Sequence, residues 1–310
     1  MTGEVVRLAA PAMGTRFEVV LAGADGSRLR GAAEAALAEV CALSERLSAF
    51  SPGSVVSHIN GRAGRGPVAV DREVFELLEL CREGWLASDG AFDITVGPLM
   101  VAWGFRGGEP QSDVEIARAR ERCGMDKVLF DRGRGTVELA AQGMRLDLGG
   151  VAKGYALDAA AAVLRGAGVE CGLMHGGTSS VLALGAPAGE DAWRVRVGEE
   201  TIGLSENALS VSAPMGRMVM RDGALLGHVL DPRTGAPARG AAMAWAVCES
   251  GAWAEVWSKA MLILGRRAAG MGEGVAGGAC DVSGRLSGRV DAVGHAPGGN
   301  PVVLKDEVCA

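Results

Sequence analysis

The chain has 310 residues and a net charge of −6, with 48% hydrophobic and 22% charged residues. That length can bury a large core, and the composition is ordinary for a globular protein. The acidic balance and the lack of a Lys/Arg run exclude a general attraction to nucleic acid, and no segment reaches about 18 uninterrupted apolar residues, so we expect no nucleic-acid partner and no membrane insertion.

The first third of the chain is predicted to hold one strand, two helices and two loops. Residues 13–22 form the first expected strand. Apolar side chains recur at helical spacing over 31–50 and 71–88, which predicts two amphipathic helices. Residues 51–66, between these helices, contain Pro, Gly, Asn and Ser and are expected to form a loop. Residues 89–108 are apolar and interrupted by Gly and Pro, which favours a packed loop with short strands.

The rest of the chain mixes helices with pairs of strands. Residues 112–123 predict a short helix, and 126–148 alternate enough for two strands. Further helices are expected over 151–167 and 252–264, and short strands in the tail, 278–306. The remaining predicted strands lie at residues 172–186, 193–198, 208–212, 217–221 and 226–230. Because helices and strands do not alternate one for one, the pattern predicts an α+β fold with mixed or antiparallel sheets flanked by helices.

The seven cysteines are widely spaced and include no CxxC pair. Several lie in apolar patterns, such as Cys41 in ALAEVCALSERL. This usage is typical of reduced core side chains and not of zinc ligands or a disulfide framework. The N-terminus also lacks a basic start followed by an apolar core of signal-peptide length. We therefore expect a cytoplasmic protein that forms a single domain over 1–310, with two lobes and no linker between them.

The strongest motif is DLGGVAKGYALD, residues 147–158. A strand ends there, Gly149 and Gly150 follow, and a helix begins. A helix N-terminus offers unpaired N–H groups and a positive dipole end, which suits a phosphate, and Lys153 adds a cation beside it. On these residues alone, a tight turn before a helix is the commoner interpretation.

Two further segments place polar side chains in apolar surroundings. The segment GAFDITVGPL, followed by WGF, combines an apolar wall with Asp93 and Thr95, which alternatively only cap local backbone. The segment GHVLDPRTGAP carries His228 on a strand and then turns at Asp231. Histidine transfers protons near neutral pH, although a lone histidine is more often structural. An Asp before Pro is by default a turn residue.

The three segments, in their order along the chain, resemble the ApbE family of FAD:protein FMN transferases, and the resemblance covers nearly the whole chain. It starts at AMGT (12–15) and continues through LSAF (47–50) and the stretch from Ser54 to Asn60. It also includes Gly176-Gly177, which precede the His228 segment, and, after that segment, the Ala-rich helix up to Gly265. No single motif would carry the resemblance, but the ordered set is very specific.

The resemblance implies that FAD binds in a cleft between two lobes, with a divalent metal, usually Mg²⁺, at its pyrophosphate. Such enzymes split FAD, join FMN to a Thr or Ser of an acceptor flavoprotein and release AMP. It further implies that His228, Lys153 and Asp231 are catalytic and that the carbonyl of Ala152 ligates the metal. The implied cofactor-binding residues are Met13, Thr15, Asn60, Phe92, Asp93, Thr95, Gly149, Gly150, Lys153, Gly176, Gly177, Ser212 and His228.

The last helix departs from the family pattern at the metal. The family reads Ala-Asp-x-x-x-Thr-Ala, and its Asp and Thr both ligate the ion because residues four apart are neighbours on a helix. Here Glu255 occupies the Asp position and Lys259 the Thr position. Glutamate keeps the carboxylate on a longer side chain, but a charged lysine that points inward repels a divalent ion. The stretch before the His strand, VSAPM (211–215), also keeps only Ser212 of the family pattern.

Three positions are open for Lys259 from the sequence alone. It can point away and pair with solvent or with Glu255 at i,i+4. It can stand at the metal position as a fixed positive charge against the pyrophosphate, which we favour because phosphates need a cation there. It can also be deprotonated and reactive.

Three functions follow from these observations. The first is a flavin transferase, which predicts AMP release and a flavinylated acceptor. The second is a flavin- or nucleotide-binding protein without the transfer step, which predicts bound FAD and no AMP. The third is a repurposed enzyme that uses the same cleft for another small molecule, because a fold does not fix a function.

Overall fold

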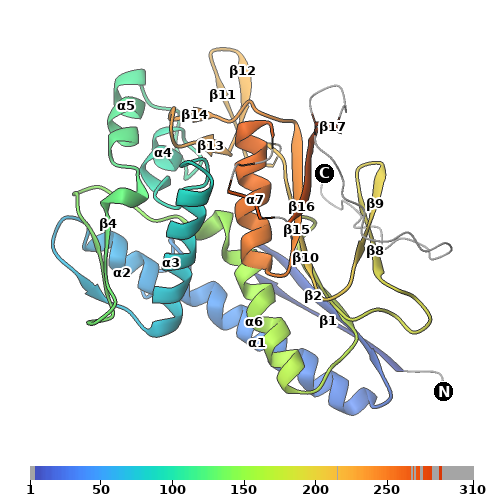
Figure 1. Cartoon of the computed structure of the whole chain (residues 1–310). Helices are drawn as coiled ribbons and strands as arrows, with labels where there is room; N and C mark the ends of the chain where they lie inside the picture. Colours follow the sequence, from blue (N-terminus) through green and yellow to red (C-terminus); the bar gives the residue numbers. More distant parts are fainter. Residues whose placement is uncertain are drawn as a thin grey trace.

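The computed structural model describes residues 4–214, 216–266, 268, 270–272, 275–280 and 286–287. Its α-helices are α1 (Gly26–Arg46), α2 (Val55–Gly61), α3 (Arg72–Ala87), α4 (Gly97–Ala102), α5 (Asp113–Glu121), α6 (Ala152–Gly166) and α7 (Gly251–Leu264) (Figure 1). The strands of its largest sheet are β1 (Glu4–Ala12), β2 (Thr15–Gly23), β6 (Gly172–Gly176), β7 (Ser180–Leu184), β10 (Ala208–Ser212), β15 (Met243–Cys248), β16 (Ala276–Cys280) and β17 (Leu286–Ser287). The other strands are β3 (Val68–Ala69), β4 (Val128–Asp131), β5 (Thr136–Leu139), β8 (Trp193–Val197), β9 (Glu200–Leu204), β11 (Met218–Arg221), β12 (Ala224–Gly227), β13 (Leu230–Asp231) and β14 (Ala236–Pro237).

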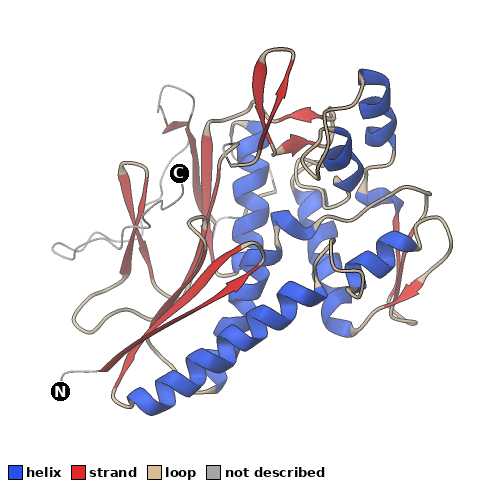
Figure 2. Ribbon diagram, turned by 180° about the vertical axis from the view of Figure 1, so that it is seen from behind, coloured by secondary structure: helices blue, strands red, loops and turns tan. Residues whose placement is uncertain are grey.

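The eight-stranded sheet has the order β1-β2-β6-β7-β10-β15-β16-β17, and its neighbouring strands pair antiparallel. Helices α1, α6 and α7 pack on one side of this sheet, and the β8–β9 hairpin lies on the other (Figures 1 and 2). Met174 and Leu182 join the apolar core beneath the helices, whereas Leu173 and Val181 join a second cluster with Val195 of the hairpin. Both faces of the sheet are therefore apolar, because successive strand residues point to opposite sides.

Helices α2 to α5 and the small sheet β3-β5-β4 lie beside α7, away from the large sheet (Figure 1). Helices α4 and α5 share an apolar cluster that includes Trp103, Ile116 and Leu230. Because Leu230 belongs to β13, this cluster ties the segment after β12 to the α4–α5 region. The segment that carries the predicted histidine is thereby held next to the helical part of the molecule.

The α+β prediction with antiparallel sheets and flanking helices is confirmed, but two predicted loops contain helices. The prediction of a loop over 51–66 is wrong because Ser54 caps α2 and Ile59 buries its apolar side. The prediction of short strands over 89–108 is also wrong, because α4 begins there with Pro98 in its first turn, where proline is tolerated.

Two strands of the large sheet are missing from the sequence prediction. Strand β1 pairs with β2 through a turn at Met13 and Gly14, both with positive φ, and β15 lies in the middle of the sheet. Of the predicted tail strands, β16 and β17 are present, and the other tail residues lie outside the described part of the chain. The division of the domain into two lobes stays a prediction. Within the described residues, no helix has the length and apolar character needed to cross a membrane.

Candidate functional site

Helices α6 and α7 touch near their N-termini, and two glycines allow this contact. A Cβ on Gly154 would lie 2.1 Å from the carbonyl oxygen of Gly251, and one on Gly251 would lie 2.5 Å from the carbonyl oxygen of Gly154. Any larger residue at either position would push the two helices apart. The contact places Lys153 of α6 beside Glu255 of α7.

Asp158 of α6 fixes the start of α7. Its carboxylate accepts a hydrogen bond from the hydroxyl of Ser250 at 2.8 Å. It accepts two more from the backbone N–H groups of Gly251 at 2.6 Å and Ala252 at 2.9 Å. These are unpaired donors of the first turn, so the carboxylate acts as a cap from a neighbouring helix. Asp158 thereby orients the helix that carries the two altered residues.

Glu255 lies at the centre of a buried charge cluster and is only 1% exposed. Its Oε1 accepts from Nζ of Lys153 at 3.1 Å and from the hydroxyl of Ser180 at 2.5 Å, and its Oε2 accepts from Nζ of Lys259. Burial alone raises the pKa of a carboxyl, but the charges of Lys153 and Lys259 lower the pKa of Glu255 to about 2. With the carboxylate ionised, two ammonium groups against one carboxylate leave one excess positive charge.

Lys259 lies one helical turn after Glu255, and its side chain is 18% exposed. Its stem runs against the Gly-Gly turn, since a Cβ on Gly150 would lie 3.3 Å from Cδ and 3.4 Å from Cε of Lys259. Burial lowers the pKa of Lys259, and Glu255 opposes this shift. Of the three positions open from the sequence, the pairing with Glu255 is present. The pair is nevertheless largely buried and lies beside Gly150, with only part of the Lys259 side chain exposed.

These residues do not fit a divalent cation. Nζ of Lys259 donates to Oε2 of Glu255, the oxygen that would otherwise be open to an ion. A unit charge and a double charge about 4 Å apart repel by about 8 kcal/mol at an effective dielectric constant of about 20. Within the described residues, no group of three or more His, Cys, Asp and Glu side chains is placed to hold a metal. Ala152, the other implied ligand, is buried as the first residue of α6.

His228 follows β12 and lies close enough to Lys259 to feel its charge. The ring meets Phe105 edge to face, with centroids 6.4 Å apart. Its Nδ1 is buried and makes no hydrogen bond of good geometry with the residues that the structure describes, although the backbone of Pro214 and Arg217 approaches the ring and partly opposes the lowering of its pKa. Burial first, and then the charge of Lys259, lowers the pKa of His228 from 6.5. The imidazole is therefore neutral at pH 7 and able to accept a proton.

Asp231 orders the turn that follows His228. Its carboxylate accepts from the backbone N–H of Arg233 at 3.0 Å and from the guanidinium of Arg233 at 2.9 and 2.8 Å. The carbonyl of Asp231 accepts from Gly235 N–H at 2.8 Å. The carboxylate is thus occupied within its own turn, as Asp before Pro commonly is. A catalytic role for Asp231 stays a prediction.

Asp93 and Thr95 bind the local backbone and each other. Asp93 accepts from the N–H and the hydroxyl of Thr95 at 2.7 and 2.6 Å, and the hydroxyl of Thr95 accepts from Gly124 N–H at 2.6 Å. Burial raises the pKa of Asp93 to about 6 despite these hydrogen bonds. Asp93 also lines a pocket of about 310 Å³ together with Trp85 and Arg233. The contacts match the capping role that the sequence left open.

The remaining predicted cofactor residues fall at two turns. Asn60 binds the chain just before the DLGG turn, since its side chain donates to the carbonyl of Leu146 at 3.0 Å and accepts from its N–H at 2.7 Å. Thr15 lies against Gly177, where a Cβ would be 2.6 Å from its hydroxyl. The other predicted residues lie nearby in the chain or against these turns: Met13 bonds to Ser44, Gly149 to Asp147, Gly176 pairs with Phe17, and Phe92 lies near Gly150.

A chain of serines beneath α7 is largely missing from the sequence prediction. Ser258 contacts the hydroxyls of Ser210 at 3.0 Å and Ser212 at 2.9 Å, and all three residues are buried. Ser180 binds Glu255 directly. The i,i+2 spacing of Ser210 and Ser212, which places both on one face of a strand, could have indicated this chain. The sequence analysis named only Ser212.

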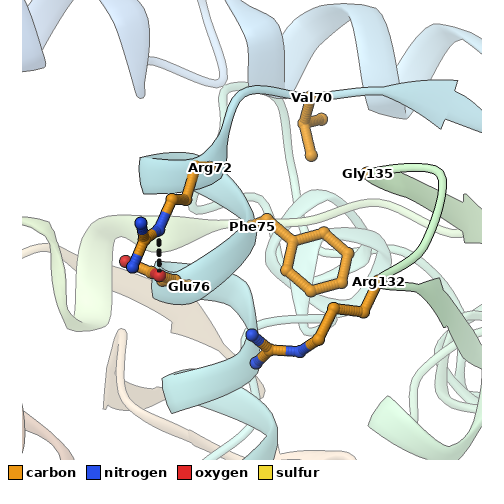
Figure 3. A pocket seen from close by; sticks show the side chains of 6 residues that line it. All are labelled: Val70, Arg72, Phe75, Glu76, Arg132 and Gly135. Atoms are coloured by element: carbon orange, nitrogen blue, oxygen red, sulfur yellow. Dashed lines mark hydrogen bonds and ion pairs between the residues drawn. The ribbon is translucent and has the colours of Figure 1, made fainter.

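A second pocket lies on the surface away from this cluster. It has a volume of about 330 Å³ and lies between α3 and the small sheet (Figure 3). At its edge Arg72 pairs with Glu76 at 2.7 Å. Its lining contains none of the predicted site residues and consists of Val70, Arg72, Phe75, Glu76, Arg132 and Gly135. The charge cluster, and not this pocket, is therefore the candidate site.

Comparison with known proteins identifies the family of the chain. The model of the ApbE family matches residues 13–272, so the chain belongs to the ApbE family. A protein of Rhodobacter capsulatus named FAD:protein FMN transferase is 30% identical, over 81% of this chain and 50% of the relative. One of Klebsiella pneumoniae with the same name is 32% identical, over 59% of this chain and 60% of the relative. The chain thus spans about half to three fifths of the length of these relatives.

Solved structures of the family share the fold. A crystal structure of an ApbE protein of Thermotoga maritima superposes with a TM-score of 0.83 and 29% identity, covering 93% of this chain and 97% of that one. The apo form of the flavinyl transferase ApbE of Pseudomonas stutzeri has a TM-score of 0.75 and 26% identity, covering 85% and 87% of the two chains. The antiparallel architecture is therefore that of the family.

Proposed function

We propose that this protein is an FAD:protein FMN transferase, which joins FMN to a Thr or Ser of an acceptor flavoprotein and releases AMP. Membership of the ApbE family and similarity to relatives of that name support the proposal. The observation that carries it is the meeting of Lys153 and Lys259, from two distant segments, on one buried carboxylate, with His228 near enough to Lys259 for that charge to lower the pKa of the histidine. Phosphoryl transfer needs cations on the phosphate and a base for the attacking hydroxyl.

In the proposed reaction, the acceptor hydroxyl attacks the phosphorus on the FMN side of the FAD diphosphate. A new P–O bond forms to the hydroxyl oxygen while the P–O bond to AMP breaks, and AMP leaves with that electron pair. His228, which is neutral at pH 7, takes the proton of the hydroxyl. Lys153 and Lys259 offset the negative charge on the phosphoryl oxygens.

The finer parts of the proposal concern the rest of the cleft. We propose that the turns of Met13, Thr15 and Gly177 and the segment 92–99 face the flavin and adenosine. Mg²⁺ is not part of the proposal, because Lys259 occupies the carboxylate that would ligate it. A cytoplasmic location is kept as a proposal and is supported by five described cysteines that are free thiols, Cys41, Cys81, Cys123, Cys171 and Cys248.

The test is transfer of flavin to a protein. The purified chain is incubated with FAD and an extract of its source cells, AMP is quantified, and proteins are separated under denaturing conditions to detect covalent flavin fluorescence. We expect AMP and a fluorescent acceptor band with the native chain and neither with His228→Ala. Bound FAD that yields no AMP and no fluorescent band would instead identify a flavin-binding protein without the transfer step.

A further inference from the structure

Both oxygens of the Glu255 carboxylate in the charge cluster already accept hydrogen bonds, so neither is open to a metal ion. Each oxygen of Glu255 accepts from a lysine, and Oε1 also accepts from Ser180. Glu255 is 1% exposed, whereas the side chains of Lys153 and Lys259 are 20% and 18% exposed. The exposed part of the cluster is therefore formed by the two lysine side chains, and the carboxylate is covered.

The carboxylate holds both lysines in place. An ammonium group has three donors, and the contacts with Glu255 use part of them. Lys259 also donates a weak hydrogen bond, at 3.4 Å, to the backbone carbonyl of Glu255 in its own helix. The stem of Lys259 is confined by Gly150, so its ammonium lies next to the Gly-Gly turn that opens α6. Two positioned cations with one excess charge form a preorganised site for an anion.

The start of α6 adds to the positive potential. The helix has 15 residues, and its N-cap, Val151, makes no side-chain hydrogen bond. Its first N–H groups therefore have no side-chain acceptor at the cap, and they lie on the same helix turn as Lys153. A diphosphate can accept from these groups and from both ammonium groups, whereas a divalent cation would meet repulsion from all of them.

We propose that Lys259, held on Glu255 opposite Lys153, takes the place of a divalent ion, so that the site binds the diphosphate of a nucleotide without any metal. This inference rests on the proposed function for the identity of that nucleotide, FAD. It goes beyond that function in assigning to a side chain the charge that a bound ion would supply. A fixed lysine cannot be removed by a chelator, so the binding step becomes independent of Mg²⁺.

The test uses two probes that need no turnover. The first is Mn²⁺ alone, titrated into the whole chain and followed by the loss of its free electron paramagnetic resonance signal. The second is ADP, a diphosphate without flavin, titrated by calorimetry in EDTA and again in MgCl₂. We expect no bound Mn²⁺, and an ADP dissociation constant that is the same with and without metal.

Variants of Lys259 test whether this side chain supplies the charge that binds the diphosphate. Lys259→Met should weaken ADP binding about tenfold or more in EDTA, as expected for the loss of a charge-assisted contact, while Lys259→Arg keeps most of the affinity. Arg196→Met removes one exposed positive charge from β8 and is the matched control, which should leave ADP binding unchanged. The melting temperature of each variant shows whether it is folded, and the Arg variant tests the proposal if Met does not fold.

The outcomes separate this inference from the proposed function. Stoichiometric Mn²⁺ binding to the native chain, or ADP binding that EDTA abolishes, would overturn the lysine-for-metal proposal even if AMP is released. ADP binding in EDTA that depends on Lys259, with no AMP and no flavinylated acceptor, would leave the inference standing and remove the transferase. An equal loss of affinity in Arg196→Met and Lys259→Met would reduce the effect to general charge and overturn the inference.

Discussion

The carboxylate of Asp158 accepts the backbone N–H of Gly251 at 2.6 Å, so the middle of α6 caps the beginning of α7. The same carboxylate holds Ala252 and the hydroxyl of Ser250. Glu255 and Lys259 follow one and two turns later on α7. The position of the charge cluster therefore depends on Asp158, although none of these three hydrogen bonds is to a member of the cluster.

Replacing Asp158 by Ala should lower the free energy of unfolding by about 2 kcal/mol, because three donors at the start of α7 lose their acceptor. Nucleotide binding should weaken as well, since α7 carries the cluster. Ser112→Ala removes the cap of α5 and is the control, with a smaller loss of stability and unchanged binding. Denaturant unfolding and ADP titration check both parts, and an unchanged midpoint for Asp158→Ala would contradict them.

The sequence predicted the fold class and the members of the cluster better than their contacts. Lys153, Glu255 and Lys259 were all singled out, and the i,i+4 pairing of the last two follows from helix geometry. The contact between Lys153 and Glu255 joins residues 102 apart in the chain. It depends on the approach of Gly154 to Gly251, which no local pattern encodes.

Other parts of the structure depend on contacts that the local sequence does not determine. Residues 51–66 have the composition of a loop, and α2 forms because Ser54 caps it and the core buries its apolar side. Asp93 and Thr95 were predicted as cofactor contacts or as backbone caps, and their hydrogen bonds are those of caps. Ser180 meets Glu255 only because β7 lies under α7 in the folded sheet.

Removing the charge of Glu255 should destabilise the protein strongly. In Glu255→Gln, the ammonium groups of Lys153 and Lys259 lose their common counter-ion in a largely buried site, and a loss of about 3 kcal/mol is expected. Glu76→Gln breaks an exposed i,i+4 pair with Arg72 and should have no measurable effect. Urea unfolding of the two variants checks the contrast, and equal midpoints would show that the buried cluster contributes nothing to stability.

The pH dependence of stability separates Glu255 from Asp93. The pKa of Glu255 is lowered in the fold, so its contribution is present above its ordinary value of 4.5 and is lost as the pH falls toward about 2. The pKa of Asp93 is raised from 3.8 to about 6, so its folded form prefers the proton. Stability therefore falls as the pH rises from about 4 to about 6, by about 3 kcal/mol from this residue.

Asp93→Asn isolates the second effect, because the amide does not titrate. The difference in unfolding free energy between the native chain and this variant should change between pH 4 and pH 6 and stay constant above pH 7. Urea unfolding at four or five pH values measures it. A difference that is independent of pH would mean that Asp93 is ionised in the fold at the same pH as in the unfolded chain.

Restoring the family's ligands should restore metal binding. Glu255→Asp with Lys259→Thr removes the ammonium group and supplies a shorter carboxylate and a hydroxyl oxygen, ligands that Mg²⁺ accepts. Calorimetry should detect Mg²⁺ binding to this double variant and none to the native chain. Lys259→Met, which removes the charge without adding an oxygen ligand, is the control. No gain of metal affinity in the double variant would mean that Lys259 is not what prevents the ion from binding.

His228 should be required for transfer and not for binding. His228→Ala should abolish AMP release while leaving the FAD dissociation constant within about twofold, because the imidazole is assigned to the proton of the acceptor and not to the phosphates. Unchanged turnover in this variant would remove His228 from the reaction.

The charge of Lys259 helps to lower the pKa of His228. Lys259→Met should therefore raise that pKa and move the acidic limb of the pH–rate profile to higher pH, beyond any overall loss of rate. The profile is measured with saturating FAD from pH 5 to pH 8. An acidic limb that stays in place would mean that the charge of Lys259 does not act on His228.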